Sequence, residues 1–205
     1  MSLHLSIRRQ YVGPLLCAAA VVAGLMGGCG SPEPLLRFNA VDISGADYAR
    51  DFRLNAADGG ERSLADYRGK VVLLFFGFTQ CPDVCPTALT RAVEVKKRLG
   101  GDGDRLQAIF VTIDPERDLP VVLREYTHAF DPTFVGLYTD VASTRKTADA
   151  FRIFYAKVPT GASYTMDHTA TSYVYDPRGQ LRLAVRHTDT AEQLTDDVRR
   201  LLKQP

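Results

Sequence analysis

Residues 71–86 have the sequence VVLLFFGFTQCPDVCP, and this stretch decides the fold. Its first six residues are all apolar, which is typical of a central strand that is buried on both faces. Residues 87–99 then predict a helix, because the proline before them suits a first helical turn and Gly100-Gly101 ends the pattern. Cys81 and Cys85 therefore lie just past the carboxyl end of a buried strand, at the start of a helix.

Strands and helices alternate along the rest of the chain. The other predicted elements, in chain order, are two short strands joined by a turn over 51–64, a strand over 106–113, a helix over about 118–130, a strand over 134–137, a helix over 143–155, a strand hairpin over 172–185 and a helix over 190–202. Asp118 is expected to cap its helix, and Thr190 to open the last helix with a capping box. The alternation predicts an α/β fold with a central, mainly parallel sheet, an antiparallel hairpin at its edge and flanking helices. Functional sites in such sheets gather at the carboxyl ends of the strands.

The amino-terminal end has the pattern of an export signal. Arg8 and Arg9 precede an apolar stretch, residues 15–25, that is too short to span a bilayer comfortably. The LMGGC motif at 25–29 resembles a bacterial lipobox, which predicts that Cys29 is lipidated and becomes the new amino terminus. The alternatives are a plain cleaved signal, or an uncleaved anchor in which Cys29 has no role. We expect an exported lipoprotein that is anchored to a membrane and faces the periplasm or another extracytoplasmic space.

Three segments follow from this pattern. Residues 1–28 are expected to form a lipoprotein signal peptide, residues 29–40 a lipidated tether, and residues 41–205 one folded domain. Removing the signal takes Arg8 and Arg9 from 25 basic side chains, which leaves 23 basic against 24 acidic ones. Because phosphate binding needs a basic surface, this near-neutral balance predicts no nucleic-acid partner.

The folded segment contains two cysteines, Cys81 and Cys85, because Cys17 falls in the signal and Cys29 is the expected lipid site. Such a pair can be a redox couple, part of a soft-metal site or a structural disulfide. Unpaired backbone N–H groups at a helix start favour a thiolate, and we expect this effect at Cys85. The three residues between the cysteines leave room for either a disulfide or an ion.

His168 is the candidate third group. It follows a polar loop expected at 159–165 and precedes the strand hairpin, which directs it toward the same edge of the sheet. Asp167 could hold the ring by a hydrogen bond, as histidine ligands of metals usually require. Two thiolates and an imidazole select Cu(I), Cu(II) or Zn(II), and the Irving–Williams order favours copper over zinc. His128 and His187 lack such a setting and are expected to be solvated or satisfied elsewhere.

Three motifs together resemble the Sco/SenC family, whose members are membrane-tethered copper proteins with a thioredoxin-like fold. The motifs are GFTQCPDVCP at 77–86, VTIDPERD at 111–118 and DHT at 167–169, and the similarity spans roughly residues 50 to 205. The resemblance implies that one copper ion, Cu(I) or Cu(II), is bound by the residues Cys81, Cys85 and His168. It also implies supporting roles for Asp83 and Asp167, and a structural role for Asp114.

The resemblance further implies delivery of copper to the CuA site of cytochrome c oxidase subunit II. The alternative is a thiol–disulfide oxidoreductase, in which Cys81 and Cys85 are catalytic and keep the CuA-site cysteines reduced. Other periplasmic copper chaperones or thiol reductants are the further partners that these roles imply. A peroxidase of the peroxiredoxin type ranks last, because the Pro-x-x-x-Thr-x-x-Cys pattern is absent around both cysteines.

Overall fold

Residues 37–204 are described by the structure, a computed structural model. The predicted signal peptide, the lipid site Cys29 and most of the predicted tether lie outside these residues. The backbone N–H groups of Asn39 and Ala40 each donate to the Asp197 carboxylate at 2.9 Å, so packing against the domain begins before residue 41. Among residues 37–204, no helix has the length and apolar character needed to cross a bilayer.

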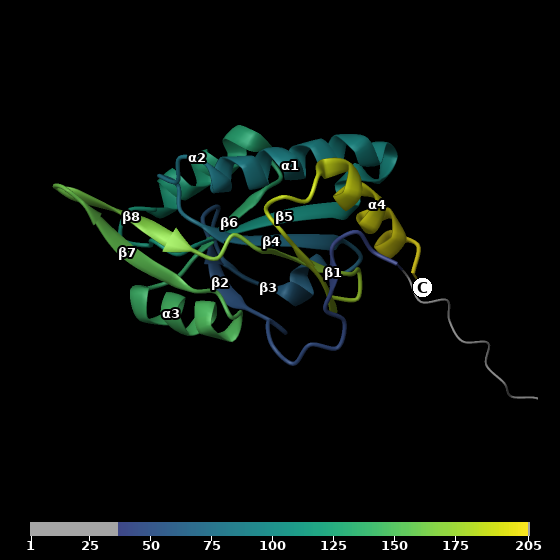
Figure 1. Ribbon diagram of the computed structural model, residues 1–205, viewed down its shortest axis with the longest axis horizontal. Helices are drawn as coiled ribbons and strands as arrows, with labels where there is room; N and C mark the ends of the chain where they lie inside the picture. Colours follow the sequence, from purple (N-terminus) through teal and green to yellow (C-terminus); the bar gives the residue numbers. More distant parts are fainter. Residues whose placement is uncertain (1–36, 205) are drawn as a thin grey trace, which may run out of the picture. The chain divides into compact units, whose positions relative to one another are not determined.

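An eight-stranded sheet forms the centre of the described domain (Figure 1). Its strands, in spatial order, are β1 (Val41–Asp42), β10 (Leu181–Val185), β9 (Ser172–Tyr175), β4 (Val71–Gly77), β5 (Leu106–Thr112), β6 (Val135–Tyr138), β2 (Arg53–Ala56) and β3 (Glu61–Ser63). The central pairs β4–β5 and β5–β6 are parallel, and antiparallel strands extend the sheet on both sides. The predicted α/β fold, with its parallel centre and the β9–β10 hairpin, is confirmed.

Helices cover both faces of this sheet. Helix α1 (Val84–Leu99) contacts α2 (Pro120–Phe130) and α4 (Ala191–Leu202) on one face, and α3 (Val141–Ala150) lies on the other side (Figure 1). Two short 3₁₀ helices, η2 (Leu64–Tyr67) and η3 (Gly100–Arg105), complete the helical elements of residues 37–204. Every residue of β4 and β5 is buried as a result, which explains their continuous apolar sequences.

The predicted boundaries of α2 and α3 were wrong. Helix α2 begins at Pro120, and Asp118 does not cap it, because the Asp118 carboxylate accepts hydrogen bonds from Thr79 and Thr112 instead. Helix α3 ends at Ala150 rather than at residue 155. The capping box at Thr190 is confirmed. The Thr190 side chain accepts from the backbone N–H of Gln193 at 3.2 Å, and the Gln193 side chain accepts from the backbone N–H of Thr190.

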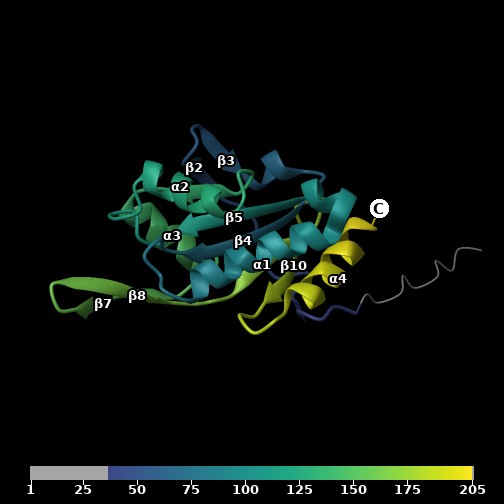
Figure 2. The ribbon, with the colours of Figure 1, turned by 90° about the horizontal axis from the view of Figure 1, so that it is seen from above.

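A second, two-stranded sheet replaces the predicted polar loop at 159–165. Strands β7 (Tyr155–Thr160) and β8 (Ser163–His168) pair along their whole length, and the hairpin extends away from the main sheet in both views (Figures 1 and 2). The pattern was missed because most of its residues are exposed or half-buried, so no regular alternation of buried and exposed residues marks the strands. The strand β8 ends at His168.

Candidate metal centre

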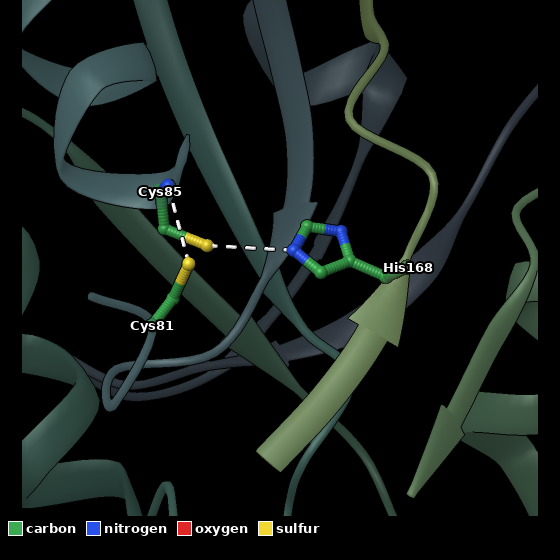
Figure 3. A group of neighbouring side chains, drawn as sticks. All are labelled: Cys81, Cys85 and His168. Carbon is green, nitrogen blue, oxygen red and sulfur yellow. Dashed lines mark hydrogen bonds between the residues drawn. The ribbon is translucent and has the colours of Figure 1, made fainter. Parts of the chain in front are cut away.

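The cysteines lie where the main sheet gives way to α1. Cys81 is in the loop that follows β4, and Cys85 is the second residue of α1, which starts three residues earlier than predicted (Figure 3). Both are buried, with 9% of Cys81 and none of Cys85 exposed. The backbone N–H of Cys85 donates to Sγ of Cys81 at 3.4 Å. The helix start therefore brings the two sulfurs together.

Gly77, the last residue of β4, leaves the space that the sulfur of Cys85 occupies. A Cβ atom at this position would lie 2.6 Å from Sγ of Cys85 and 2.8 Å from the Phe110 ring. Neither neighbour could accept such a contact without moving. The sequence placed this glycine directly after the predicted strand over 71–76, and nothing in its pattern indicated that it makes room for a thiol.

The two thiols differ strongly in acidity. The pKa of Cys81 is lowered to about 5, first by the hydrogen bond from the Cys85 thiol and then by backbone N–H groups of Asp83 and Cys85, with His168 adding the least. The pKa of Cys85 is raised, because its proton is held by Cys81 and because the thiol is buried. The prediction of a thiolate at Cys85 was therefore wrong, because the N–H groups at the helix start stabilise the thiolate of Cys81 instead.

His168 approaches the sulfurs from the hairpin side (Figure 3). Its ring meets the edges of Phe75 and Phe78, each with a centroid distance of 5.9 Å. Nδ1–H donates to the backbone carbonyl of Thr169 at 3.0 Å, since a carbonyl can only accept. The other nitrogen, Nε2, faces Sγ of Cys85 at 3.7 Å, so it is the ring atom that can bind an ion placed between the ring and the sulfurs.

The side chains of the two acidic residues that were expected to support the site make no hydrogen bond to Cys81, Cys85 or His168 among the described residues. Asp167 is exposed, because neighbouring residues of a strand point to opposite faces, and the ring hydrogen bond expected of it is made by Thr169 instead. Asp83 is the residue that precedes α1, and its carbonyl accepts hydrogen bonds from Thr87. Its contribution to Cys81 comes through its backbone N–H group.

Asp118 was not expected near the site, yet it fixes the loop that leads to Cys81. Its buried carboxylate accepts from the N–H of Thr79 at 3.0 Å, from the Thr79 hydroxyl at 2.6 Å and from the Thr112 hydroxyl at 2.6 Å. Burial raises the pKa of Asp118, and these hydrogen bonds oppose the rise. The loop before the cysteines is thus tied to the end of β5.

Cys81, Cys85 and His168 form one cluster. Their ligand atoms, two Sγ and one ring nitrogen, all lie within 4.8 Å of one another. Cys81 and Cys85 are not joined by a disulfide. Two sulfurs and an imidazole in this arrangement suit a soft or borderline ion, which is the chemistry that the sequence indicated.

A family model described as SCO1/SenC matches residues 41–203. The chain belongs to this family. Among relatives of this Sco chain, the SCO2-like protein of Rickettsia felis is 32% identical over 173 residues, which cover 78% of this chain and 84% of that protein. The mitochondrial SCO2 homolog of Bos taurus is 36% identical over 154 residues, 73% of this chain and 58% of that longer protein.

Solved structures give the same family. ScoI of Bradyrhizobium japonicum, determined with copper bound, is 39% identical, with a TM-score of 0.67 and coverage of 74% of this chain and 97% of that one. The apo Sco1 protein of Thermus thermophilus is 36% identical, with a TM-score of 0.70 and coverage of 82% and 99%. The thioredoxin-like fold that the resemblance implied is confirmed by these neighbours.

Proposed function

We propose that this chain binds one copper ion through Cys81, Cys85 and His168, and supplies copper to the CuA centre of cytochrome c oxidase subunit II. The convergence of two sulfurs and Nε2 within 4.8 Å carries the proposal. It is supported by the copper-bound ScoI of Bradyrhizobium japonicum, which is 39% identical over most of its length. Thiolates are strong ligands of Cu(I), and three ligands suffice for that ion.

The protonation of the site suits a carrier that must also release its cargo. Cys81 is a thiolate at neutral pH, whereas Cys85 gives up its proton when copper enters, so loading is coupled to proton release. His168 is half-buried and is the last residue of β8, at the end of the hairpin away from its turn. An acceptor can reach the ion there. Transfer then proceeds by exchange of these ligands for thiols of the acceptor.

The amino-terminal pattern completes the proposal. Residues 1–28 would be removed and lipidated Cys29 would hold the chain at the membrane. The predicted tether over 29–40 would then lead to the copper domain on the extracytoplasmic side, with Asn39 and Ala40 already packed against that domain. Mass spectrometry of the membrane-extracted protein tests this, because a lipidated chain starts at Cys29 and carries the mass of the acyl groups. A Cys29→Ala variant should lose that mass and leave the membrane fraction.

A copper titration of the full chain in detergent tests the site. The reduced protein competes with a chromophoric Cu(I) chelator, and one equivalent is expected to bind. His168→Ala should weaken binding roughly tenfold or more, a loss of about 1.4 kcal/mol or greater, and Cys81→Ser should abolish the site. His128→Ala is the matched control, because His128 is an exposed histidine on α2. Binding that survives both site changes would refute the proposal.

The asymmetric thiol pair favours a second candidate function, a thiol–disulfide oxidoreductase. The Cys81 thiolate would attack a disulfide of the CuA site and form a mixed disulfide. Cys85 would then lose its proton and attack Sγ of Cys81, which releases the partner as a dithiol and leaves a Cys81–Cys85 disulfide. Turnover on an oxidised CuA domain that persists in His168→Ala and without copper would favour this function over copper transfer.

A further inference from the structure

The position of His168 depends on how the hairpin is held. Strands β7 and β8 form their own sheet, and no ladder joins them to the eight strands of the described main sheet. Figure 2 shows the hairpin reaching outward from the domain. Side chains that hold the hairpin against the domain therefore help to set the distance between the ring of His168 and the sulfurs.

Arg117, which follows β5, connects the hairpin to the cysteine loop. Its Nη1 donates to the backbone carbonyl of Tyr164 on β8 at 2.8 Å and to Oε1 of Gln80 at 3.2 Å. The guanidinium also stacks on the Tyr164 ring, with its carbon 3.7 Å from the ring centre. Gln80 immediately precedes Cys81, so one side chain contacts both halves of the site.

Asp114 fixes Arg117 and Tyr164 in place. Its side chain is fully buried, Nε of Arg117 donates to its Oδ2, and the Tyr164 hydroxyl donates to its Oδ1 at 2.9 Å. A planar guanidinium can make the ion pair, the carbonyl contact and the ring stack at the same time, which an ammonium group cannot. We call Asp114, Arg117 and Tyr164 the hairpin anchor.

A second arginine holds the other strand in a similar way. Arg145 of α3 stacks on Tyr155, with its guanidinium carbon 3.6 Å from the ring centre, and donates to the Tyr155 carbonyl at 3.2 Å. Tyr155 pairs directly with His168 across the hairpin. The hydrogen bond of Arg145 goes to β7, whereas Arg117 also bonds the cysteine loop.

We propose that Arg117 is a positioning residue, which keeps Nε2 of His168 against the two sulfurs by coupling the hairpin to the cysteine loop. Tyr164 precedes His168 by four residues on the same strand, which is about 13 Å, so a tilt of about 10° at the anchor moves the ring by about 2 Å. That displacement is large compared with the 3.7 Å contact between Nε2 and Cys85. This inference rests on the proposed copper site.

A double-mutant cycle tests whether Arg117 acts through His168. Arg117→Lys keeps the positive charge but loses the planar guanidinium with its several N–H donors. This change should weaken Cu(I) binding by the full chain about tenfold. In a His168→Ala background the same change should alter affinity less than twofold, because the ligand that it positions is already gone. Equal loss in both backgrounds, or no loss in the wild-type background, would overturn the proposal.

Glu116→Gln is the matched control. Glu116 lies beside Arg117 in the same loop and makes an exposed ion pair with Lys157 on the same hairpin. It contacts neither Gln80 nor Tyr164 among the hydrogen bonds of the described residues. Its removal should leave copper affinity within twofold. A loss as large as that of Arg117→Lys would mean that any disturbance of this loop acts on the site, which overturns a specific role for Arg117.

Hydrogen exchange of the metal-free, reduced protein gives a readout that does not use copper. Amides of residues 155–168 should exchange faster in Arg117→Lys, while those of β4 and β5 stay unchanged. Unchanged hairpin exchange, or equal acceleration in β4 and β5, would overturn the proposal. If Arg117→Lys fails to fold, Tyr164→Phe removes one anchor bond and should shift exchange and affinity in the same directions. A wild-type chain that binds no copper would refute the proposed function, and the exchange result would still decide whether Arg117 holds the hairpin.

Discussion

The two halves of the candidate metal centre are built in different ways. The cysteines follow β4, whose residues are all buried and which pairs with β5 on one side and β9 on the other. The histidine ends a two-stranded hairpin in which most residues are exposed or half-buried. The cysteine half is thus fixed by the core of the domain, whereas the histidine half depends on a few contacts between the hairpin and the domain. We therefore expect that one half can be altered without the other.

The largest expected effect concerns the acidity of Cys81. With a pKa of about 5 instead of 9.0, its thiolate should be on the order of a thousandfold more populated at pH 6. Because a lowered pKa means that the thiolate already predominates above pH 5, alkylation by iodoacetamide should rise with a midpoint near pH 5 and level off by about pH 6. Peptide mass spectrometry of the metal-free, reduced protein measures the rate at Cys81.

Two variants show which half of the site sets this acidity. His168→Ala should keep the low midpoint, because the hydrogen bond from His168 contributes least to the lowered pKa of Cys81, whereas Cys85→Ala should shift the midpoint toward the ordinary value. An equal shift in both variants would show that the cysteine half is not complete without the hairpin. A wild-type midpoint near pH 9 would contradict the low pKa itself.

A change in the sheet core should damage the whole domain. Phe110 on β5 is fully buried and packs against Phe75 and Tyr126, with ring centroids 6.1 and 5.5 Å away. Phe110→Ala should lower the free energy of unfolding by about 3–5 kcal/mol, through lost burial and the cavity that remains. Urea unfolding of the metal-free protein measures this loss. A cost below about 1 kcal/mol would mean that the sheet is less rigid than its burial indicates.

A methyl group on Gly77 should disturb the core and the site together. The added Cβ would meet Cys85 and Phe110 at less than 3 Å, so Gly77→Ala should cost about 1–3 kcal/mol of unfolding free energy and weaken copper binding. Gly101→Ala is the control, because a Cβ there meets nothing within 4 Å, and its cost should stay within about 0.5 kcal/mol. Similar results for the two variants would show that the space beside Cys85 is not limiting.

The sequence predicted the cysteine half well for a physical reason. Strands buried on both faces have continuous apolar sequences, so 71–76 and 106–113 matched β4 and β5 closely. The position of the thiols then followed from chain order. What could not be predicted is which thiol is ionised, because that depends on the hydrogen bond between the two thiols and on the backbone N–H groups that face Cys81.

The histidine half was predicted less well. Its strands are polar, since they gain stability from cross-strand pairing and from arginines on the domain rather than from burial. A pattern of hydrophobicity cannot detect such strands, and residue 155 was assigned to a helix. The placement of His168 beside the thiols drew support from the family resemblance. The hydrogen bond from its ring to Thr169 could not be predicted from the sequence, because it uses the backbone carbonyl, which every residue has.

The smallest expected effect is that of His168→Ala on the stability of the metal-free protein. The change removes two edge contacts, with Phe75 and Phe78, and leaves the Thr169 carbonyl to water at a half-exposed position. Such contacts are worth about 0.5–1.5 kcal/mol each at most, and part of this is regained by solvation, so a loss of about 1 kcal/mol is expected. Urea unfolding under the conditions used for Phe110→Ala gives the direct comparison. A loss as large as that of Phe110→Ala would mean that the hairpin end belongs to the cooperative core, and the two halves of the site would then not be separable. A small loss, together with strongly weakened copper binding, would show that this ring is kept at the sulfurs for the metal rather than for the fold.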